Sequence, residues 1–461
     1  MTHPQASHGV SPPTPLQGAH PAARHSRVRG CPGEARASAF VDGARLQARL
    51  DALARIGATA RGGVDRPALS HEDALAQAEM VRWGAALGLQ AGRDAVGNFF
   101  LRLPGRDASA APVLSGSHLD SQPTGGRFDG VYGVVAAFEA VQALVDAGVV
   151  PRRAIDIVAW MNEEGSRFAP GMMGSAVFAG DRTLAETAAA ADAGGVTVGT
   201  ALRTVHAALA RMQAEGLPAI AERALGGPVH AYVEAHIEQG PVLEQRGIPV
   251  GVVTGIQGKH TWRIEVQGEA AHAGTATRAE RKDALLAALA MVQAMAAAFH
   301  DADDVTKFTV GRFEVLPNAP SVVPSRVVFS IDLRHPDTAA LQRMADQVAP
   351  LCEAQRGPCA VAVHRLSSAD SLAFPTAMQA RIRGAAQALG IPTLDLPSAA
   401  GHDARYLHRV APSAMVFVPC HRGITHHEAE YARPEDLLAG TRVLADVLQA
   451  LACDDRDEGA R

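Results

Sequence analysis

The chain has few cysteines and no long apolar run, and both shortages narrow the class of protein. Only five of the 461 residues are cysteine, an odd number, and no two form a Cys-x-x-Cys pair. This usage suggests neither a disulfide framework nor a thiolate zinc site, so we expect the reducing cytoplasm as the compartment. The longest apolar run, residues 285–299, is shorter than the ~20 residues that a bilayer span needs, so we expect no membrane segment.

A block of basic residues is also missing. The net charge is -5 at pH 7, with no long run of lysine or arginine, so nothing marks a nucleic-acid or membrane surface. Apolar residues make up 47% and charged residues 20%, which is ordinary for a soluble globular enzyme. A small polar molecule is the partner that this composition favours.

The length predicts more than one folded unit. A chain of 461 residues exceeds what one core usually supports, at ~150 residues per domain. Residues 1–36 are rich in Pro, Ala, Gly, His and Arg, without an apolar period, and are predicted to be a disordered tail. Its four histidines could bind metal, but a compositional extension is the simpler interpretation.

Beyond the tail, short apolar runs alternate with helical spacing. Residues 46–87 have helical spacing, and residues 131–145 carry one apolar helical face. The predicted buried strands are residues 112–117, 154–161, 229–235 and 414–419. Continuous apolar strands separated by helices predict an α/β fold with a large mixed, mostly parallel sheet covered by helices.

A different pattern interrupts this sheet. The predicted order is a strand at 262–266, a helix at 278–299, strands at 309–315 and 327–333, a helix at 339–353 and a strand at 360–364. This βαββαβ series is typical of a ferredoxin-like α+β domain. Because sheet-like strands resume after it, we expect residues 258–368 to be inserted between two parts of one domain, residues 37–257 and 369–461.

Residues of the metal-ligand type follow each buried strand. The four clusters are Ser117-His118-Leu119-Asp120, Asn162-Glu163-Glu164, His236-Ile237-Glu238 and, after a short loop, Thr425-His426-His427. In open parallel sheets, sites form beyond the carboxyl ends of the strands. The clusters are therefore expected to meet in one crevice.

Each cluster leaves alternatives open. His118 could be a ligand oriented by Asp120, or a hydrogen-bonded surface histidine. Asp129 could bridge two cations or cap the helix that follows. Adjacent Glu163 and Glu164 repel each other at a buried strand end unless a cation or a proton is present, whereas solvated loop glutamates would need neither. With a metal, one glutamate would be a ligand and the other a general base.

The histidines cannot all be ligands. Of His236, His272, His402, His426 and His427, we interpret His402 and His427 mainly as structural residues. Nitrogen and oxygen ligands without cysteine fit Zn²⁺, and equally Mn²⁺, Co²⁺ or Ni²⁺.

In their order, these clusters resemble a known family. The matching segments are GSHLDSQPTGGRFDGVYG, NEEGSRFAPGMMGS, EAHIEQGPVLE, GEAAHAGT, SIDLRHP, AAGHDA and GITHHEAE. They resemble the N-carbamoyl-L-amino acid hydrolases, β-ureidopropionases and allantoate amidohydrolases, a branch of the dinuclear zinc aminoacylase and carboxypeptidase superfamily. The resemblance runs from about residue 39 to about residue 450 and implies a zinc exopeptidase-like large domain. It also implies that the inserted domain is a lid that forms a homodimer.

The resemblance implies a role for each matched residue. Two divalent ions, Zn²⁺ first, are held by His118 and His236 on one side and by Glu164 and His426 on the other, with Asp129 bridging. Glu163 is the general base, and His272 stabilises the oxyanion, reaching the site across a dimer interface. Arg334 grips the substrate carboxylate, and further substrate contacts are Gln239, Asn318 and Gly401.

The implied reaction is hydrolysis of an N-carbamoyl-L-amino acid, a small ureido substrate with a carboxylate, to amino acid, CO₂ and ammonia. Allantoate amidohydrolase is the alternative, and an aminoacylase, a peptidase or a non-catalytic binding protein is less favoured. Two departures weaken the assignment of the substrate: Ser321 stands where asparagine is common, and Ala276-Thr277-Arg278 replaces a Thr-Pro-Met-like run.

Overall fold

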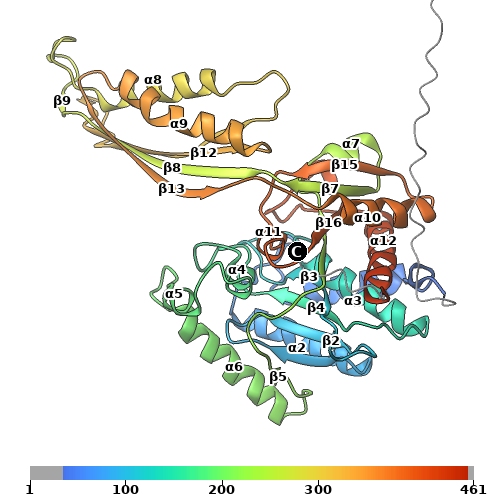
Figure 1. Cartoon of the computed structure of the whole chain (residues 1–461). Helices are drawn as coiled ribbons and strands as arrows, with labels where there is room; N and C mark the ends of the chain where they lie inside the picture. Colours follow the sequence, from blue (N-terminus) through green and yellow to red (C-terminus); the bar gives the residue numbers. More distant parts are fainter. Residues whose placement is uncertain (1–34, 455–461) are drawn as a thin grey trace, which may run out of the picture.

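The computed structural model describes residues 35–454, and these form one large sheet and a smaller one beside it (Figure 1). The tail predicted for residues 1–36 therefore lies outside the described residues, apart from its last two. None of the described helices combines the length and the apolarity needed to span a bilayer.

The large sheet has ten strands. Their order is β14 (Leu372–Ala373), β7 (Val250–Ile256), β16 (Ser413–Val418), β6 (Ala231–Ile237), β3 (Val113–His118), β4 (Ile155–Trp160), β2 (Phe99–Leu103), β1 (Gln90–Arg93) and β5 (Ala221–Glu222), with β15 (Thr393–Ser398) paired to β7. Strands β16, β6, β3 and β4 are parallel, whereas β2 and β7 join this centre antiparallel. The predicted mixed, mostly parallel sheet is confirmed, and the four predicted strands are these four central ones.

Helices pack around this sheet. They are α1 (Gly43–Ala54), α2 (His71–Ala86), α3 (Val131–Asp146), α4 (Met173–Phe178), α5 (Leu184–Ala189), α6 (Val198–Ala214), α7 (Val242–Arg246), α10 (Thr376–Ala388), α11 (Ala404–Leu407) and α12 (Pro434–Ala452), with 3₁₀ turns η1 (Ala37–Ala39) and η2 (His421–Gly423). The helical spacing of residues 46–87 belongs to two helices, α1 and α2, because Gly57 at φ 84° and Pro67 lie in the turn between them.

The smaller sheet has the antiparallel order β10-β12-β8-β13 and its own apolar core. The elements are β8 (Gly258–Gln267), α8 (Ala284–Ala298), β10 (Lys307–Leu316), β12 (Arg326–His335), α9 (Thr338–Gln355) and β13 (Ala360–Ala369), and β9 (Ala271–His272) pairs with β11 (Val322–Val323) beside them. Helix α8 begins at Ala284 rather than at residue 278 because Asp283 caps it. We call β8 through β13 the small-sheet unit.

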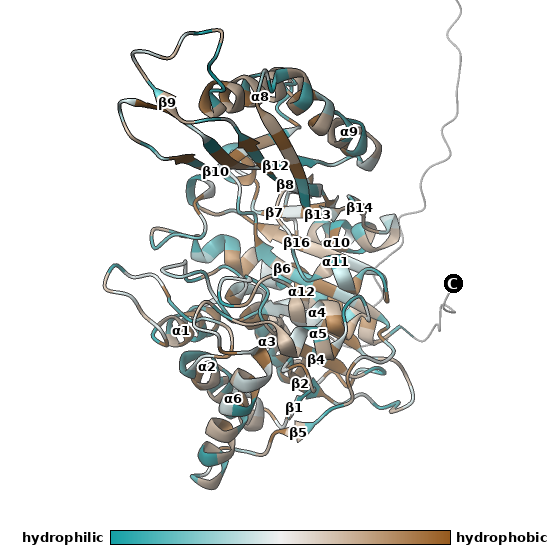
Figure 2. Cartoon of the chain, turned by 90° about the vertical axis from the view of Figure 1, so that its left-hand side faces the viewer, coloured by the Kyte–Doolittle hydropathy of each residue, from teal (hydrophilic) through white to brown (hydrophobic). Residues whose placement is uncertain are grey.

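Only one face of the smaller sheet is covered by helices. Along β8, His260, Trp262, Ile264 and Val266 are buried, and the last three lie in the core beneath α8 and α9. The alternate residues Lys259, Thr261, Arg263 and Glu265 are part-exposed and polar. Both helices lie on the side away from the large sheet (Figures 1 and 2), so the polar face looks toward the large sheet.

Helix α3 lies close to strand β6, and a glycine permits this. A Cβ built on Gly133 would lie 2.3 Å from the carbonyl oxygen of Ala235. We expect Gly133→Ala to lower the free energy of unfolding by roughly 1–3 kcal/mol through over-packing, measured by urea denaturation.

Gly199→Ala in α6 is the matched control. There the nearest atom, the carbonyl oxygen of Ala188, is 3.3 Å from the added Cβ. The control should unfold within about 1 kcal/mol of the wild type, since alanine favours a helix. Equal stability of the two variants would contradict the tight packing of α3.

Candidate metal centre

The predicted ligands meet at the carboxyl ends of the central strands. His236 Nε2 lies 3.2 Å and His118 Nε2 3.9 Å from Asp129 Oδ1. His426 Nε2 lies 3.2 Å from Asp129 Oδ2 and 3.5 Å from Glu164 Oε2. Two groups of three residues, with ligand atoms within 4.8 Å of one another, therefore share Asp129: His118 with His236, and Glu164 with His426.

The centre is a buried cluster of carboxylates and imidazoles. His118, Asp129 and His236 are 2%, 6% and 1% exposed, whereas the His426 side chain is 47% exposed. Burial lowers the pKa of His118 to about 4 and raises the pKa of Glu164 to about 7. Burial also acts to lower the pKa of His236, but its hydrogen bond to Asp129 and the charge there raise it to about 9. Such a donor set suits a divalent cation, which compensates the buried negative charge.

Asp129 is held in place from several sides. Gln239 Nε2 and Thr425 Oγ1 each donate to Asp129 Oδ2 at 2.9 Å. Glu430 Oε1 accepts the backbone N–H groups of Phe128 and Asp129, at 2.8 and 3.0 Å. The N-cap of α3 is Gly130, without a side-chain cap bond, so a helix cap is not the role of Asp129.

A glycine beside Asp129 is required by the geometry. Gly130 has φ 66°, and a Cβ built on it would lie 2.4 Å from the His118 ring. Gln239 and His426 also have positive φ, at 57° and 53°. Backbone strain of this kind at residues that line a centre is typical of functional sites.

Asp120 contacts His118 through its backbone carbonyl rather than through its carboxylate. His118 Nδ1 lies 2.9 Å from the backbone carbonyl oxygen of Asp120 and 3.6 Å from its carboxylate. The carboxylate instead accepts the backbone N–H groups of Glu163 and Glu164, both at 3.2 Å. Asp120 therefore joins two clusters: its carbonyl orients His118, and its side chain anchors the turn with the two glutamates.

The two glutamates point to different partners. Gln122 donates to both carboxylate oxygens of Glu164, from its backbone N–H at 3.1 Å and from Nε2 at 2.8 Å. Glu163 Oε2 lies 3.6 Å from His118 Nε2. Burial, followed by the charges of Asp403 and Glu164, raises the pKa of Glu163 well above its usual range. Glu163 therefore lies beside the group with His118, and Glu164 beside His426.

The remaining predicted site residues lie elsewhere. His272 is in β9 and Asn318 precedes β11, and β9 lies at the far end of the small-sheet unit (Figure 1). Arg334, near the end of β12, donates from Nη1 to the carbonyl oxygen of Ala399 at 2.9 Å. Ala399 is two residues before Gly401, so Arg334 and Gly401 lie at the junction between the small-sheet unit and the large sheet.

Sequence reasoning missed the residues that support the ligands. Gln122, Thr425 and Glu430 lie in the segments that carry the family resemblance, and Thr425 begins one of the four clusters. No role was assigned to them, because their roles come from contacts between distant segments. A third group, Glu234, His236 and His402, has ligand-type atoms within 4.8 Å of one another. Two members of this group are already hydrogen-bonded to other residues. Glu234 accepts from Ser117, Tyr232 and the Ala404 N–H, and His402 Nε2 lies 2.8 Å from Ser398 Oγ. This agrees with the interpretation of His402 as a structural residue.

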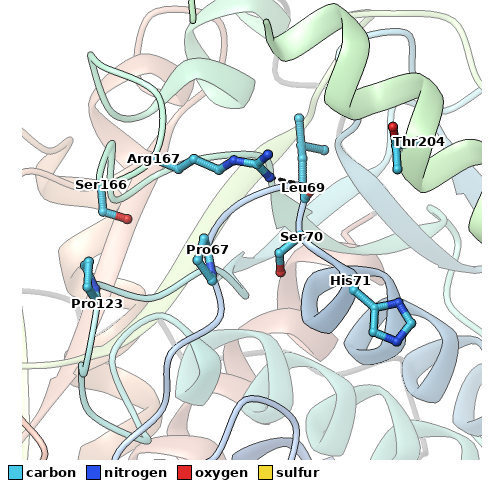
Figure 3. A pocket seen from close by; sticks show the side chains of 8 residues that line it. All are labelled: Pro67, Leu69, Ser70, His71, Pro123, Ser166, Arg167 and Thr204. Atoms are coloured by element: carbon cyan, nitrogen blue, oxygen red, sulfur yellow. Dashed lines mark hydrogen bonds between the residues drawn. The ribbon is translucent and has the colours of Figure 1, made fainter. Parts of the chain in front are cut away.

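An open pocket of about 470 Å³ lies outside the ligand cluster (Figure 3). It is lined by Pro67, Leu69, Ser70, His71, Pro123, Ser166, Arg167 and Thr204. No ligand residue lines it, and the Arg167 guanidinium donates to the carbonyl oxygens of Ala68 and Leu69 and to Asp192. We therefore assign no chemistry to this pocket.

The α/β sheet with its cluster of histidines and carboxylates defines a metal-dependent hydrolase. Residues 114–450 match peptidase family M20/M25/M40, and the chain belongs to this family. It is therefore an enzyme of the hydrolase class.

Relatives similar over nearly the whole length have more specific names. An N-carbamoyl-L-amino-acid amidohydrolase of Rhizobium meliloti is 37% identical over 90% of this chain and 96% of its own. An allantoate amidohydrolase of Bacillus subtilis is 33% identical over 87% and 96%. The crystal structure of a hydantoinase/carbamoylase family amidase from Burkholderia multivorans has a TM-score of 0.80 and 42% identity, covering 90% of this chain and 99% of that one.

Asp129 is the residue that both ligand groups share. We expect Asp129→Asn to retain less metal than the wild type after equal loading and dialysis, because each group loses a charged oxygen, with metal measured by plasma mass spectrometry.

Glu238→Gln is the control for that experiment. Glu238 is 7% exposed, and its two oxygens accept the Val242 and Leu243 N–H groups instead of facing the ligands. It should keep the metal content of the wild type. Wild-type metal content in Asp129→Asn would refute a shared ligand.

Proposed function

We propose that the chain hydrolyses the ureido C–N bond of N-carbamoyl-L-amino acids, releasing the amino acid, CO₂ and ammonia. The observation that carries the proposal is Asp129 shared between two ligand groups, with Glu163 beside one of them. The relatives named for this activity, at 34–37% identity over most of the chain, support the substrate class.

The ligand set suits two divalent ions. His118 and His236 would hold one ion, Glu164 and His426 the other, and Asp129 would contact both. Zn²⁺ fits nitrogen and oxygen donors, as do Mn²⁺, Co²⁺ and Ni²⁺. Bound there, such ions supply Lewis acidity toward the ureido carbonyl.

Glu163 is the proposed general base. It is close to His118 but makes no direct hydrogen bond to it, since Oε2 and Nε2 are 3.6 Å apart. Its carboxylate would take a proton from the attacking water and deliver it to the leaving nitrogen. Gln239, held against Asp129, and the loop at Gly401 would border the substrate.

We further propose that residues 258–368 form a lid and dimerisation domain between two parts of the catalytic domain, residues 37–257 and 369–461. Apolar side chains are exposed on this unit: Leu286 and Leu289 on α8, and Phe313 and Leu316 on the edge strand β10. An unpaired edge strand beside exposed apolar residues suits pairing with a second copy. Strand β9, which carries His272, lies at the far end of the small-sheet unit, away from the central strands that carry the ligands (Figure 1). His272 would therefore serve the site of the partner subunit.

In this proposal Arg334 binds the substrate carboxylate at the junction, and Asn318 contacts the substrate from the lid. A guanidinium suits a planar carboxylate. A cytoplasmic location also belongs to the proposal. The free cysteines Cys352, Cys359 and Cys420 suit it, whereas the disulfide-bonded Cys453 does not.

The competing substrate is allantoate, which the Bacillus subtilis relative is named for. Purified enzyme reloaded with each metal should be assayed for ammonia release from N-carbamoyl-L-amino acids and from allantoate, with a dipeptide panel read for free amino groups. The highest kcat/KM should be on an N-carbamoyl-L-amino acid. A clear preference for allantoate or for dipeptides would replace the proposed substrate.

Glu163→Gln tests the base. The amide keeps the shape but cannot accept the proton, so kcat should fall by about 10²–10⁴-fold. Metal content should stay at the wild-type level, because Glu163 is not a proposed ligand. Glu238→Gln is the control that should keep its kcat. Near-normal turnover in Glu163→Gln would remove this residue as the base.

The shared site is tested by mixing two inactive variants. Glu163→Gln and His272→Ala homodimers should both be impaired, whereas co-expressed mixed dimers should regain part of the activity. In a mixed dimer, one site combines an intact Glu163 with the partner subunit's His272. A monomer by light scattering, or mixed dimers as inactive as the parents, would rule out the shared site.

A further inference from the structure

The Arg334 guanidinium is already paired with a carboxylate. Its Nε and Nη2 donate to the two oxygens of Asp332, at 2.7 and 3.2 Å, and its Nη1 donates to the Ala399 carbonyl. An arginine paired with an aspartate has no net charge and attracts a second anion weakly, since the two fields cancel. If Arg334 is to bind a substrate carboxylate, another positive charge is needed beside it.

Lys259 supplies that charge. It lies opposite Arg334 in the pairing of β8 with β12, so both side chains share one face of the sheet. Lys259 Nζ lies 3.3 Å from Asp332 Oδ2, on the carboxylate that also holds Arg334. The two positively charged side chains, Lys259 and Arg334, therefore share the single carboxylate of Asp332. The three side chains together have a net charge of +1.

This group is placed to meet a ligand. All three side chains are partly exposed, at 44%, 26% and 30%. The alternation of burial along β8 and β12 puts them on the face opposite α8 and α9, and both helices lie on the side away from the large sheet (Figures 1 and 2). The neighbour of Arg334 on its other side, Lys307, lies 2.6 Å from Asp304 and adds no unmatched charge. The excess positive charge is therefore at Lys259 and Arg334.

We propose that Lys259 is a specificity-determining residue that keeps the Arg334 site positive, so that it accepts the single carboxylate of an anionic substrate. This inference rests on the proposed function, which places a substrate carboxylate at Arg334. An N-carbamoyl amino acid carries one negative charge, which the group matches. The amino acid product gains an ammonium group and has no net charge, so the same group binds it less tightly and favours its release.

The test compares full-length, metal-loaded variants on matched substrates. Lys259→Gln should raise the KM for an N-carbamoyl-L-amino acid by about three- to tenfold, with kcat little changed. Its KM for the corresponding uncharged carboxamide should stay at the wild-type value. Lys259→Arg, which keeps the charge, should stay close to wild type on both substrates.

Two further variants separate charge from structure. Lys259→Gln combined with Asp332→Asn restores a net charge of +1 and should recover much of the lost affinity. Arg263→Gln removes a positive charge from the same face, about 13 Å along β8. That distance exceeds the Debye length of ~8 Å at 0.15 M ionic strength, so its KM should change little.

Three results would overturn the role of Lys259: an unchanged KM in Lys259→Gln, an equal rise for the carboxamide, or an equal effect of Arg263→Gln. If the wild type prefers allantoate or a dipeptide, the proposed function fails. The Lys259 variants are then compared on that carboxylate-bearing substrate, which still tests whether Lys259 keeps the Arg334 site positive. An enzyme inactive on every carboxylate-bearing substrate would overturn both.

Discussion

The centre depends on keeping several carboxylates charged where water is largely excluded. Asp129, Glu163, Glu164 and Asp120 all lie within a few side chains of one another, and burying such charges is costly unless they are compensated. Histidines contact Asp129, and backbone N–H groups bind Asp120. Divalent metal binding at this cluster would complete this compensation. At the strand ends, the buried carboxylates therefore point at imidazoles or backbone N–H groups rather than directly at one another.

A layer of polar residues behind the ligands fixes their directions. Glu430 accepts the backbone N–H groups of Phe128 and Asp129, and Gln122 donates to both oxygens of Glu164. Deeper in the sheet, Glu234 accepts hydrogen bonds from Ser117, Tyr232 and the Ala404 N–H. These contacts between distant segments orient each carboxylate, which residue type alone cannot reveal.

In the proposed reaction, the residues beside the reacting bond and the residues that bind the substrate carboxylate lie on different sheets. The ligand cluster lies at the carboxyl ends of β3, β4 and β6, whereas Arg334 and Lys259 lie on a different sheet that meets the large one at the Ala399 loop. A substrate held at both places would span the junction between the two sheets. Motion of one sheet relative to the other would then change the distance between the two halves of the site, as expected for a lid.

The local features of this protein could be predicted from its amino-acid sequence. Continuous apolar runs predicted the four central strands, and because parallel strands end at one edge, their ligand clusters were expected together. The tertiary structure was needed to choose between alternative roles of a residue wherever the role depends on a partner distant in sequence. Asp129 could have been a helix cap, but Gly130 is the N-cap of α3, and His236 and His426 lie beside Asp129. Asp120 supports its neighbours through both its backbone and its side chain. The pairing of Lys259 with Arg334 depends on the register between β8 and β12. Residue spacing along the chain predicts local helices and strands. Strand register and side-chain direction are set by packing between segments far apart in sequence.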